Sequence, residues 1–337
     1  MICTRTLSSM DMPLPLDISA GTSVTIGNFD GVHLGHQALL ELTRKRAEEA
    51  GTLPVAITFD PHPLEVLTPH APPRLTSTQT RLALLEKSGM ALVILITFTP
   101  ELAAMSPEAF VHRILQDNLH MCELFLGYDF TLGKGRAGTP EVLAELGRRE
   151  GFAVERLEAL SVDGDVVSST RIRELLRQGD VWEASALLGR LYTVRGEIIH
   201  GQNRGGRLLG FPTANLAPVA TMLPKPGVYA TLAVPSNSVG NGLPTINSMS
   251  DMEHAYAAVT NIGYNPTFGP GALTIETHLL DFSQDLYGKQ LEVAFVERLR
   301  GEVSFTGPEA LMAQIKKDTE RARAILNQNR PDRSSVR

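Results

Sequence analysis

The chain changes its pattern of apolar segments near residue 190, and this change determines which architectures it can adopt. In the first half, short apolar runs alternate with segments rich in helix formers. The runs typical of strands cover residues 24–26, 54–59, 91–98, 122–126 and 152–157, and the helical segments cover 38–50, 80–88, 107–116 and 140–150. This alternation predicts a parallel sheet with helices on both faces and ligands at the carboxyl ends of its strands.

After residue 191, segments of strand character follow one another without helices between them. They cover residues 192–201, 227–234, 255–262, 273–282 and 290–300. They predict a barrel or a curved antiparallel sheet, followed by one helix from Pro308 to about Asn327. We expect segment 235–254, rich in Ser, Asn, Gly and Pro, to be a surface loop between two strands. The predicted domains are 1–187 and 188–330, with a polar tail over 331–337.

Composition excludes several classes of protein. A chain of 337 residues can hold two domains, and 43% hydrophobic with 20% charged residues is ordinary for a globular protein. The two cysteines, Cys3 and Cys122, are too few for a disulfide framework and fit a reducing compartment. We expect a cytoplasmic protein, because residues 1–20 lack a signal-peptide pattern and no apolar run is long enough to span a membrane. The net charge of −6 argues against a general nucleic-acid binder.

A polar turn joins the first predicted strand to the first helix. Residues 27–36 read Gly-Asn-Phe-Asp-Gly-Val-His-Leu-Gly-His. A strand, a tight turn and a helix N-terminus can form an anion site, because the first helical amides are unpaired and carry the positive end of the helix dipole. His33 and His36 could both face a bound phosphate and stabilise charge that develops during transfer. The alternative is an N-capping loop with two solvated histidines.

Two other segments of the first half have two interpretations each. The hydroxyls of residues 168–170 either cap a helix or hold phosphate oxygens, with Arg171 as a counter-charge. The glycine-rich loop 133–138, which carries Lys134 and Arg136, is either a solvated turn or a cover over a ligand phosphate.

In the second half, a glycine-rich stretch over 201–210 leads into Phe-Pro-Thr-Ala-Asn at 211–215. Thr213 and Asn215 lie two apart, so their oxygens face the same side of an extended segment. Such neutral oxygens suit a Mg²⁺ ion that keeps several waters and shares nucleotide phosphates. The alternative is a Pro-Thr turn with structural hydrogen bonds.

A carboxylate stands in an apolar strand pattern further along the chain. Alternation places Ile275, Thr277 and Leu279 on one face and Glu276 on the other. A carboxylate in such a strand needs a partner or a function. Glu276 is therefore either a general base toward a substrate hydroxyl or a paired structural glutamate.

Taken together, these segments resemble the bacterial family of bifunctional riboflavin kinase/FMN adenylyltransferases. The resemblance spans roughly residues 24–325 and is carried, in order, by GNFDGVHLGH, TFDPHP, GYDFTLGKGRAG, VSSTRIR, LGFPTANL, PGVYA, NIGYNPTFG and ETHLLDFSQDLYGK. It implies a Rossmann-like α/β domain of the HxGH nucleotidyltransferase type, followed by a riboflavin-kinase β-barrel with a C-terminal helix. It also implies two reactions. In the barrel, ATP with Mg²⁺ would phosphorylate riboflavin to FMN, and in the α/β domain a second ATP would adenylylate FMN to FAD.

The resemblance also implies roles for individual residues. In adenylylation, His33 and His36 would stabilise the α-phosphate, with Arg171 as a further catalytic residue. The nucleotide or flavin would be bound there by Gly27, Asn28, Phe29, Asp30, Gly31, Asp129, Phe130, Ser169 and Thr170. In the barrel, Gly210, Thr213 and Asn215 would bind ATP, with Thr213 and Asn215 next to the metal. Glu276 would be the general base for the ribityl hydroxyl.

The sequence departs from the family at three places, one of which, Tyr264-Asn265, is a variable spot from which nothing follows. Leu132 and Thr139 stand where the family commonly has Phe and Asp, in a loop that the resemblance places near FMN. The insertion 235–254 is longer than the usual hairpin. The alternatives are an enzyme with one inactive site and a flavin-binding protein without turnover. The sequence leaves open the oligomeric state and the transfer of FMN between sites.

Overall fold

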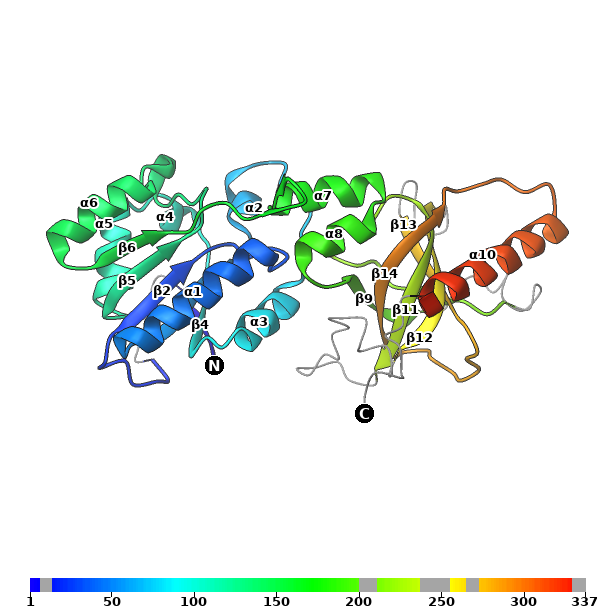
Figure 1. The fold of residues 1–337 in the computed structure, drawn as a ribbon, viewed down its shortest axis with the longest axis horizontal. Helices are drawn as coiled ribbons and strands as arrows, with labels where there is room; N and C mark the ends of the chain where they lie inside the picture. The colour runs from blue at the N-terminus through cyan, green and yellow to red at the C-terminus, as the bar shows by residue number, and fades with distance from the viewer. Residues whose placement is uncertain (7–13, 200–210, 237–254, 265–272, 329–337) are drawn as a thin grey trace. The chain divides into compact units, whose positions relative to one another are not determined.

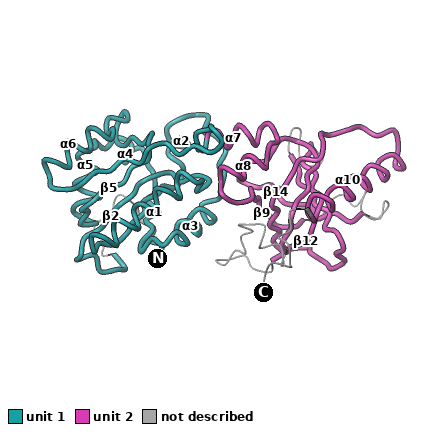
Figure 2. Tube along the Cα trace, viewed as in Figure 1, with its two compact units in different colours: residues 1–169 teal, residues 170–337 magenta. Residues whose placement is uncertain are grey.

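The computed structural model describes residues 1–6, 14–199, 211–236, 255–264 and 273–328. The chain divides into two compact units, unit 1 over Met1–Ser169 and unit 2 over Thr170–Arg337 (Figure 2). The division thus falls earlier in the chain than the domain boundary expected at residues 187 and 188, which stays a prediction.

Unit 1 is built on a six-stranded sheet in the order β1-β4-β3-β2-β5-β6, with every neighbouring pair parallel. Its strands are β1 (Ile2–Arg5), β2 (Thr22–Ile26), β3 (Leu53–Asp60), β4 (Leu92–Thr97), β5 (Met121–Leu126) and β6 (Ala153–Arg156). The central strands are buried along most of their length, so they appear in the sequence as continuous apolar runs. The parallel sheet is confirmed. Strand β1 escaped prediction because it is a four-residue edge strand.

Helices connect these strands (Figure 1). They are α1 (Leu34–Ala50), α2 (Pro63–Leu67), α3 (Thr78–Lys87), α4 (Pro100–Ala103), α5 (Pro107–Phe110), which continues as a π-helical stretch over Val111–Gln116, and α6 (Pro140–Glu150). Helices α2, α4, α5 and α6 begin with proline after a capping His, Thr or Ser, which fixes their first residues. The predicted helical segments 107–116 and 140–150 are confirmed.

Apolar cores lie on both faces of this sheet. On one face, α1 and α3 contribute Leu39, Leu40 and Leu85, which pack with Ala56 and Val93. On the other face, side chains of α5, the π-helical stretch and α6 pack against β2, β3, β4 and β5. The expectation of helices on both faces is therefore correct.

Unit 2 contains a closed antiparallel barrel in the order β10-β13-β12-β11-β14-β9. Its strands are β9 (Tyr192–Ile199), β10 (Ala214–Leu216), β11 (Gly227–Ser236), β12 (Tyr256–Tyr264), β13 (Leu273–Leu279) and β14 (Gln290–Arg300). The barrel prediction is confirmed. Pro235 and Ser236 belong to β11 because they pair with β14, which corrects the start of the expected loop; residues 237–254 lie outside the described residues. Helices α7 (Ser169–Gln178) and α8 (Val181–Leu188) precede the barrel, and α8 contacts β9 and β14.

The strands of the barrel present different side chains to its interior and to its outer side. Inside, the buried Thr260 hydroxyl bonds those of Thr231 at 2.8 Å and Thr277 at 3.0 Å, so each hydroxyl is satisfied. Outside, helix α10 (Pro308–Gln328) places Ala322 and Leu326 against the apolar outer residues of β11 and β14. In the described residues, no helix is both long and apolar enough to cross a membrane.

An ion pair attaches α10 to the barrel. Arg300 Nη2 lies 2.8 Å from Oδ2 of Asp318, whose side chain is 7% exposed, and Gln314 also donates to this carboxylate. We expect Asp318→Asn to lower the free energy of unfolding by about 2–3 kcal/mol, because it leaves the Arg300 charge partly buried without its partner. Urea unfolding measures this change, with Glu320→Gln on the exposed face of α10 as the control. Equal stabilities of the two variants would contradict the assignment.

Candidate functional site

The first candidate site is the turn between β2 and α1. Strand β2 lies between β3 and β5, where the strand order of the sheet reverses, and this is where parallel α/β sheets bind ligands. The turn contains two non-glycine residues in the left-handed region, Phe29 at φ 48° and Val32 at φ 39°. Such conformations persist only where the surroundings hold them, and they concentrate at functional sites.

The sequence of the turn follows from this geometry. The Phe29 ring is fully buried and lies 3.1–3.3 Å from where a Cβ of residue 27 would be, so a larger residue than Gly27 would press on this ring. Gly31 has φ +85°, which also favours glycine. Phe29 can therefore reach a ligand only through its main chain, and the assignment of residues 27–31 to ligand binding stays a prediction.

Asp30, inside the turn, connects it to residues 75–76. Its carboxylate is 3% exposed and accepts hydrogen bonds from the Leu75 amide at 3.0 Å and the Thr76 amide at 3.1 Å. The Thr76 hydroxyl in turn accepts from the Gly31 amide at 3.1 Å. Asp30 thus holds residues 75–76 against the main chain of the β2–α1 turn.

We expect Asp30→Asn to lower the free energy of unfolding by about 1–3 kcal/mol, because a buried amide group replaces an acceptor that two main-chain amides use. Urea unfolding of the whole chain, followed by far-UV circular dichroism, measures the change. Glu158→Gln, at an exposed position of unit 1, is the control and should leave stability unchanged. An Asp30→Asn protein as stable as this control would show that the carboxylate does not hold the turn.

His33 and His36 form one rigid pair at the start of α1. His33 Nδ1 accepts a hydrogen bond from the His36 amide at 3.3 Å, and the two rings stack with centroids 3.6 Å apart and planes 16° apart. The edge of Phe29 contacts His36 at a centroid distance of 5.2 Å. Because Nδ1 is an acceptor, the proton of a neutral His33 ring sits on Nε2. His33 does cap the helix, as the alternative interpretation held, but it is 6% exposed rather than solvated.

Ser169 reaches the same turn from the far end of unit 1. Its hydroxyl donates to the Asp30 main-chain oxygen at 2.8 Å, over 139 residues of sequence separation. Thr170 and Arg171 follow in α7, at the residues with which unit 2 begins, and Arg171 pairs with Glu174 at 3.0 Å. Their assignment to phosphate binding stays a prediction.

The loop after β5 accommodates Leu132 and Thr139, the two residues of this loop that depart from the family. Leu132 is 8% exposed and belongs to the apolar core, and it pairs with Gly138 through two main-chain hydrogen bonds. The Thr139 hydroxyl caps α6, a role that an aspartate also fills. In the same loop Asp129 is exposed and Phe130 is half-buried against this core, so a ligand role for both stays a prediction.

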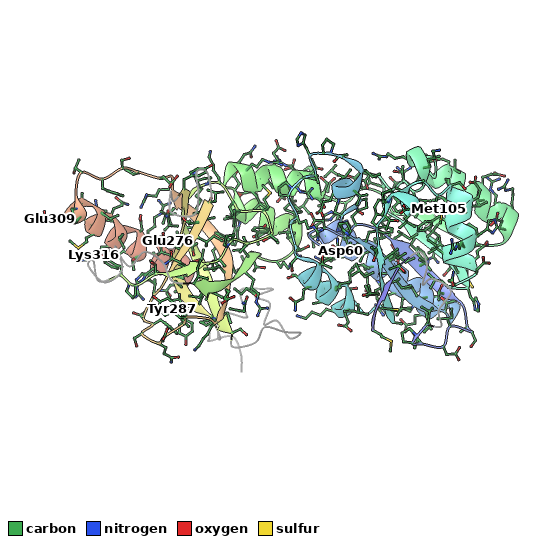
Figure 3. All side chains as sticks on the ribbon, turned by 180° about the vertical axis from the view of Figure 1, so that it is seen from behind. Asp60, Met105, Glu276, Tyr287, Glu309 and Lys316 are labelled. Carbon is green, nitrogen blue, oxygen red and sulfur yellow. The ribbon has the colours of Figure 1, made fainter. Side chains whose placement is uncertain are left out.

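The second candidate site lies on the outer face of the barrel. Glu276 on β13 is directly opposite Asn215 on β10 and Asn261 on β12. Directly opposed residues of antiparallel strands share a face, and Glu276 alternates with the buried Ile275 and Thr277. Three polar side chains thus form a row across the barrel wall, whose middle member is marked in Figure 3.

Glu276 is the titratable member of this row. Its half-buried position raises the pKa of Glu276, because burial disfavours the charged form. Within the part of the chain that the structure describes, no hydrogen bond or ion pair engages this carboxylate. A paired structural role therefore has no partner among these residues.

Thr213 and Asn215, which belongs to this row, show the alternating burial that the sequence predicted. Both are half-buried, whereas Ala214 and Leu216 between and after them are buried. His278, two residues beyond Glu276, bonds the Pro212 oxygen through Nδ1 at 2.7 Å and so holds this segment; sequence reasoning did not assign it a role. Gly210 lies outside the described residues. No group of three or more His, Cys, Asp or Glu residues suited to a metal occurs among the residues described.

Sequence reasoning also missed Arg81 on α3. It is 2% exposed and donates to the main-chain oxygens of Asn28, at 3.0 Å, and Phe59, at 2.7 Å. A single arginine in a helical pattern gives no signal of such a contact, since its partners lie 53 and 22 residues away.

Comparison with known proteins assigns a family to each part of the chain. The FAD synthetase family model matches residues 17–171, and the riboflavin kinase family model matches residues 188–326. A crystal structure described as a macrolide-efflux protein from Streptococcus pneumoniae is 28% identical, with a TM-score of 0.80 over 95% of this chain and 98% of that one.

Two curated relatives carry both activities in their name, bifunctional riboflavin kinase/FMN adenylyltransferase. The protein from Haemophilus influenzae is 37% identical over 309 residues, which cover 91% of this chain and 95% of that protein. The protein from Pseudomonas fluorescens is 38% identical over 306 residues, which cover 90% and 93%. The chain therefore belongs to the family of bifunctional riboflavin kinase/FMN adenylyltransferases.

Proposed function

We propose that this chain phosphorylates riboflavin to FMN in the barrel and adenylylates FMN to FAD in the α/β unit. The observation that carries the proposal is the presence of two separate sets of transfer groups in one chain. One is the stacked pair His33 and His36 at the start of α1, and the other is the carboxylate of Glu276 in its polar row. Family membership supports both reactions.

In the barrel, a ribityl hydroxyl oxygen of riboflavin attacks the γ-phosphorus of ATP, and ADP leaves. Glu276 accepts the hydroxyl proton, and its raised pKa makes it a better base than an exposed glutamate. Gly210, Thr213 and Asn215 bind the nucleotide. The hydroxyl and amide oxygens of Thr213 and Asn215 fit Mg²⁺, which supplies charge neutralisation at the phosphates when bound.

In the α/β unit, a phosphate oxygen of FMN attacks the α-phosphorus of a second ATP, and pyrophosphate leaves. His33 and His36 donate to the α-phosphate oxygens, where negative charge increases in the transition state. The N-terminus of α1 adds its dipole. Ser169, Thr170 and Arg171 hold the phosphates, and Asp129 with Phe130 lines the nucleotide or flavin pocket.

The ligands of this chain are thus riboflavin, FMN, ATP and Mg²⁺, with no role for nucleic acid given the net charge of −6. We place the reactions in the cytoplasm, since Cys3 and Cys122 are both free thiols.

Chromatography of the products formed from riboflavin, ATP and Mg²⁺ tests the proposal. FMN followed by FAD supports both sites. FMN alone would indicate an inactive adenylyltransferase and would direct attention to Leu132 and Thr139. Bound riboflavin without product would contradict catalysis and favour a flavin-binding protein.

A further inference from the structure

A buried cation lies against the start of the β2–α1 turn. The Arg81 guanidinium, in the first half of α3, is 2% exposed. Its Nη1 donates to the Asn28 oxygen at 3.0 Å, and its Nη2 donates to the Phe59 oxygen at 2.7 Å. Asn28 follows β2 and Phe59 lies near the end of β3, so one side chain fixes the carboxyl ends of two neighbouring strands.

Burial of this charge is costly, because a guanidinium loses its hydration and burial opposes its charged form. In the described residues, the hydrogen bonds of Arg81 go to these two main-chain oxygens and not to a carboxylate. The nearby carboxylates serve other groups, since Asp30 accepts from the Leu75 and Thr76 amides and Asp60 pairs with Arg74 at 2.8 Å. Hydrogen bonds to main-chain oxygens therefore hold Arg81, while the charges of Asp30 and Asp60 favour its charged form.

The Asn28 oxygen is the point from which the strained turn begins. It accepts a second hydrogen bond from the Thr58 hydroxyl at 3.2 Å, so the side chains of a strand and a helix fix it together. The next residue, Phe29, has φ 48°, and Val32 has φ 39° immediately before His33. A turn with two such residues keeps its shape only if its ends are held.

We propose that Arg81 is a positioning residue for adenylyl transfer, which holds the Asn28 and Phe59 oxygens and so sets the turn that presents His33 and His36. The inference rests on the proposed adenylyltransferase function of this turn. Small displacements of catalytic groups cost about 10²-fold in rate. We therefore expect Arg81→Met to slow FAD formation about 100-fold. Arg81→Lys keeps the charge but not the planar two-point contact, so its loss should be near 10-fold.

The test uses the full chain under single-turnover conditions, with saturating ATP and with enzyme in excess over FMN. The rate constant then reports the chemical step of folded molecules and does not depend on the folded fraction, which a purely structural role would change. Arg148→Met is the control, because Arg148 is 73% exposed and pairs only with Glu145 among the described residues. Riboflavin phosphorylation in each preparation should stay at the wild-type rate.

Thr58→Val gives an independent approach to the same oxygen, and it keeps the inference testable if Arg81→Met does not fold. Because both side chains act through the Asn28 oxygen, the Arg81→Lys/Thr58→Val protein should be slowed by a factor different from the product of the single effects. Wild-type single-turnover rates in the Arg81 variants, or strictly multiplicative effects, would overturn the inference. A wild-type chain that forms no FAD would instead contradict the proposed function itself.

Discussion

Replacement of His36 by alanine is expected to lower FAD formation about 10²–10³-fold, because the α-phosphate loses one donor that faces its developing charge. FMN formation from riboflavin should continue at the wild-type rate, since Glu276, Thr213 and Asn215 all belong to the other unit. The substitution should remove the imidazole ring without disturbing the N-terminal cap of α1. The His33 cap accepts from the main-chain amide of residue 36, which alanine keeps, so the start of α1 should survive.

The measurement is the rate of FAD formation from FMN and ATP beside the rate of FMN formation from riboflavin in the same preparation. His70→Ala is the matched control, because His70 is an exposed histidine of the same unit. Loss of both activities in a folded His36→Ala protein would contradict the assignment of two separate sites. Unchanged FAD formation would show that the histidine pair has no part in the transfer.

Elements whose burial or capping leaves a continuous local pattern could be predicted from the sequence. Strands β2 to β4 are buried along most of their length and so appear as apolar runs, and the Pro140 start of α6 follows a capping threonine. Among the strands that were not predicted, β1 has four residues and β10 has three. Such segments become strands only through their tertiary partners, β4 for the first and β9 with β13 for the second. No local pattern encodes these pairings.

The same difference between local patterns and distant contacts applies to the candidate sites. His33 and His36 are three residues apart, so a single stretch of sequence contains their relationship. The supports of the turn are distant: Asp30 bonds residues 45 and 46 positions away, and Arg81 lies 53 positions from Asn28. Likewise, alternation separates Glu276 from Ile275, but only the strand register brings Asn215 and Asn261 beside it. Sequence thus indicated candidate groups for the transfer reactions, whereas the structure identified what holds them.

Glu276→Gln is expected to lower riboflavin phosphorylation about 10²–10⁴-fold, because an amide cannot accept the hydroxyl proton. FAD formation from supplied FMN should not change, since that reaction is assigned to the other unit. The matched control is Glu197→Gln, which removes an exposed carboxylate from strand β9 of the same barrel. A Glu276→Gln protein with nearly wild-type FMN formation would exclude the general-base role.

The same substitution should change stability in a direction that depends on pH. Burial raises the pKa of Glu276 in the folded chain above its ordinary value, so the folded state holds this proton more tightly than the unfolded state does. The contribution of Glu276 to stability is therefore present below the unfolded pKa and is lost as pH rises through the folded pKa. Glutamine does not titrate, so the thermal midpoint of Glu276→Gln relative to wild type should be higher at pH 8 than at pH 4.

These two results together separate catalysis from structure at this position. A general base at Glu276, which has no partner among the described residues, makes the wild-type chain less stable at pH 8. Its removal should lower the activity and raise the stability. A structural glutamate with an ionic partner would behave in the opposite way, because its removal would lower the midpoint most at pH 8, where the pair is charged. Thermal melts of the Glu276→Gln and Glu197→Gln proteins at both pH values, beside their FMN formation rates, distinguish the two outcomes. A lower midpoint at pH 8 with intact kinase activity would establish the structural role and remove Glu276 from the mechanism.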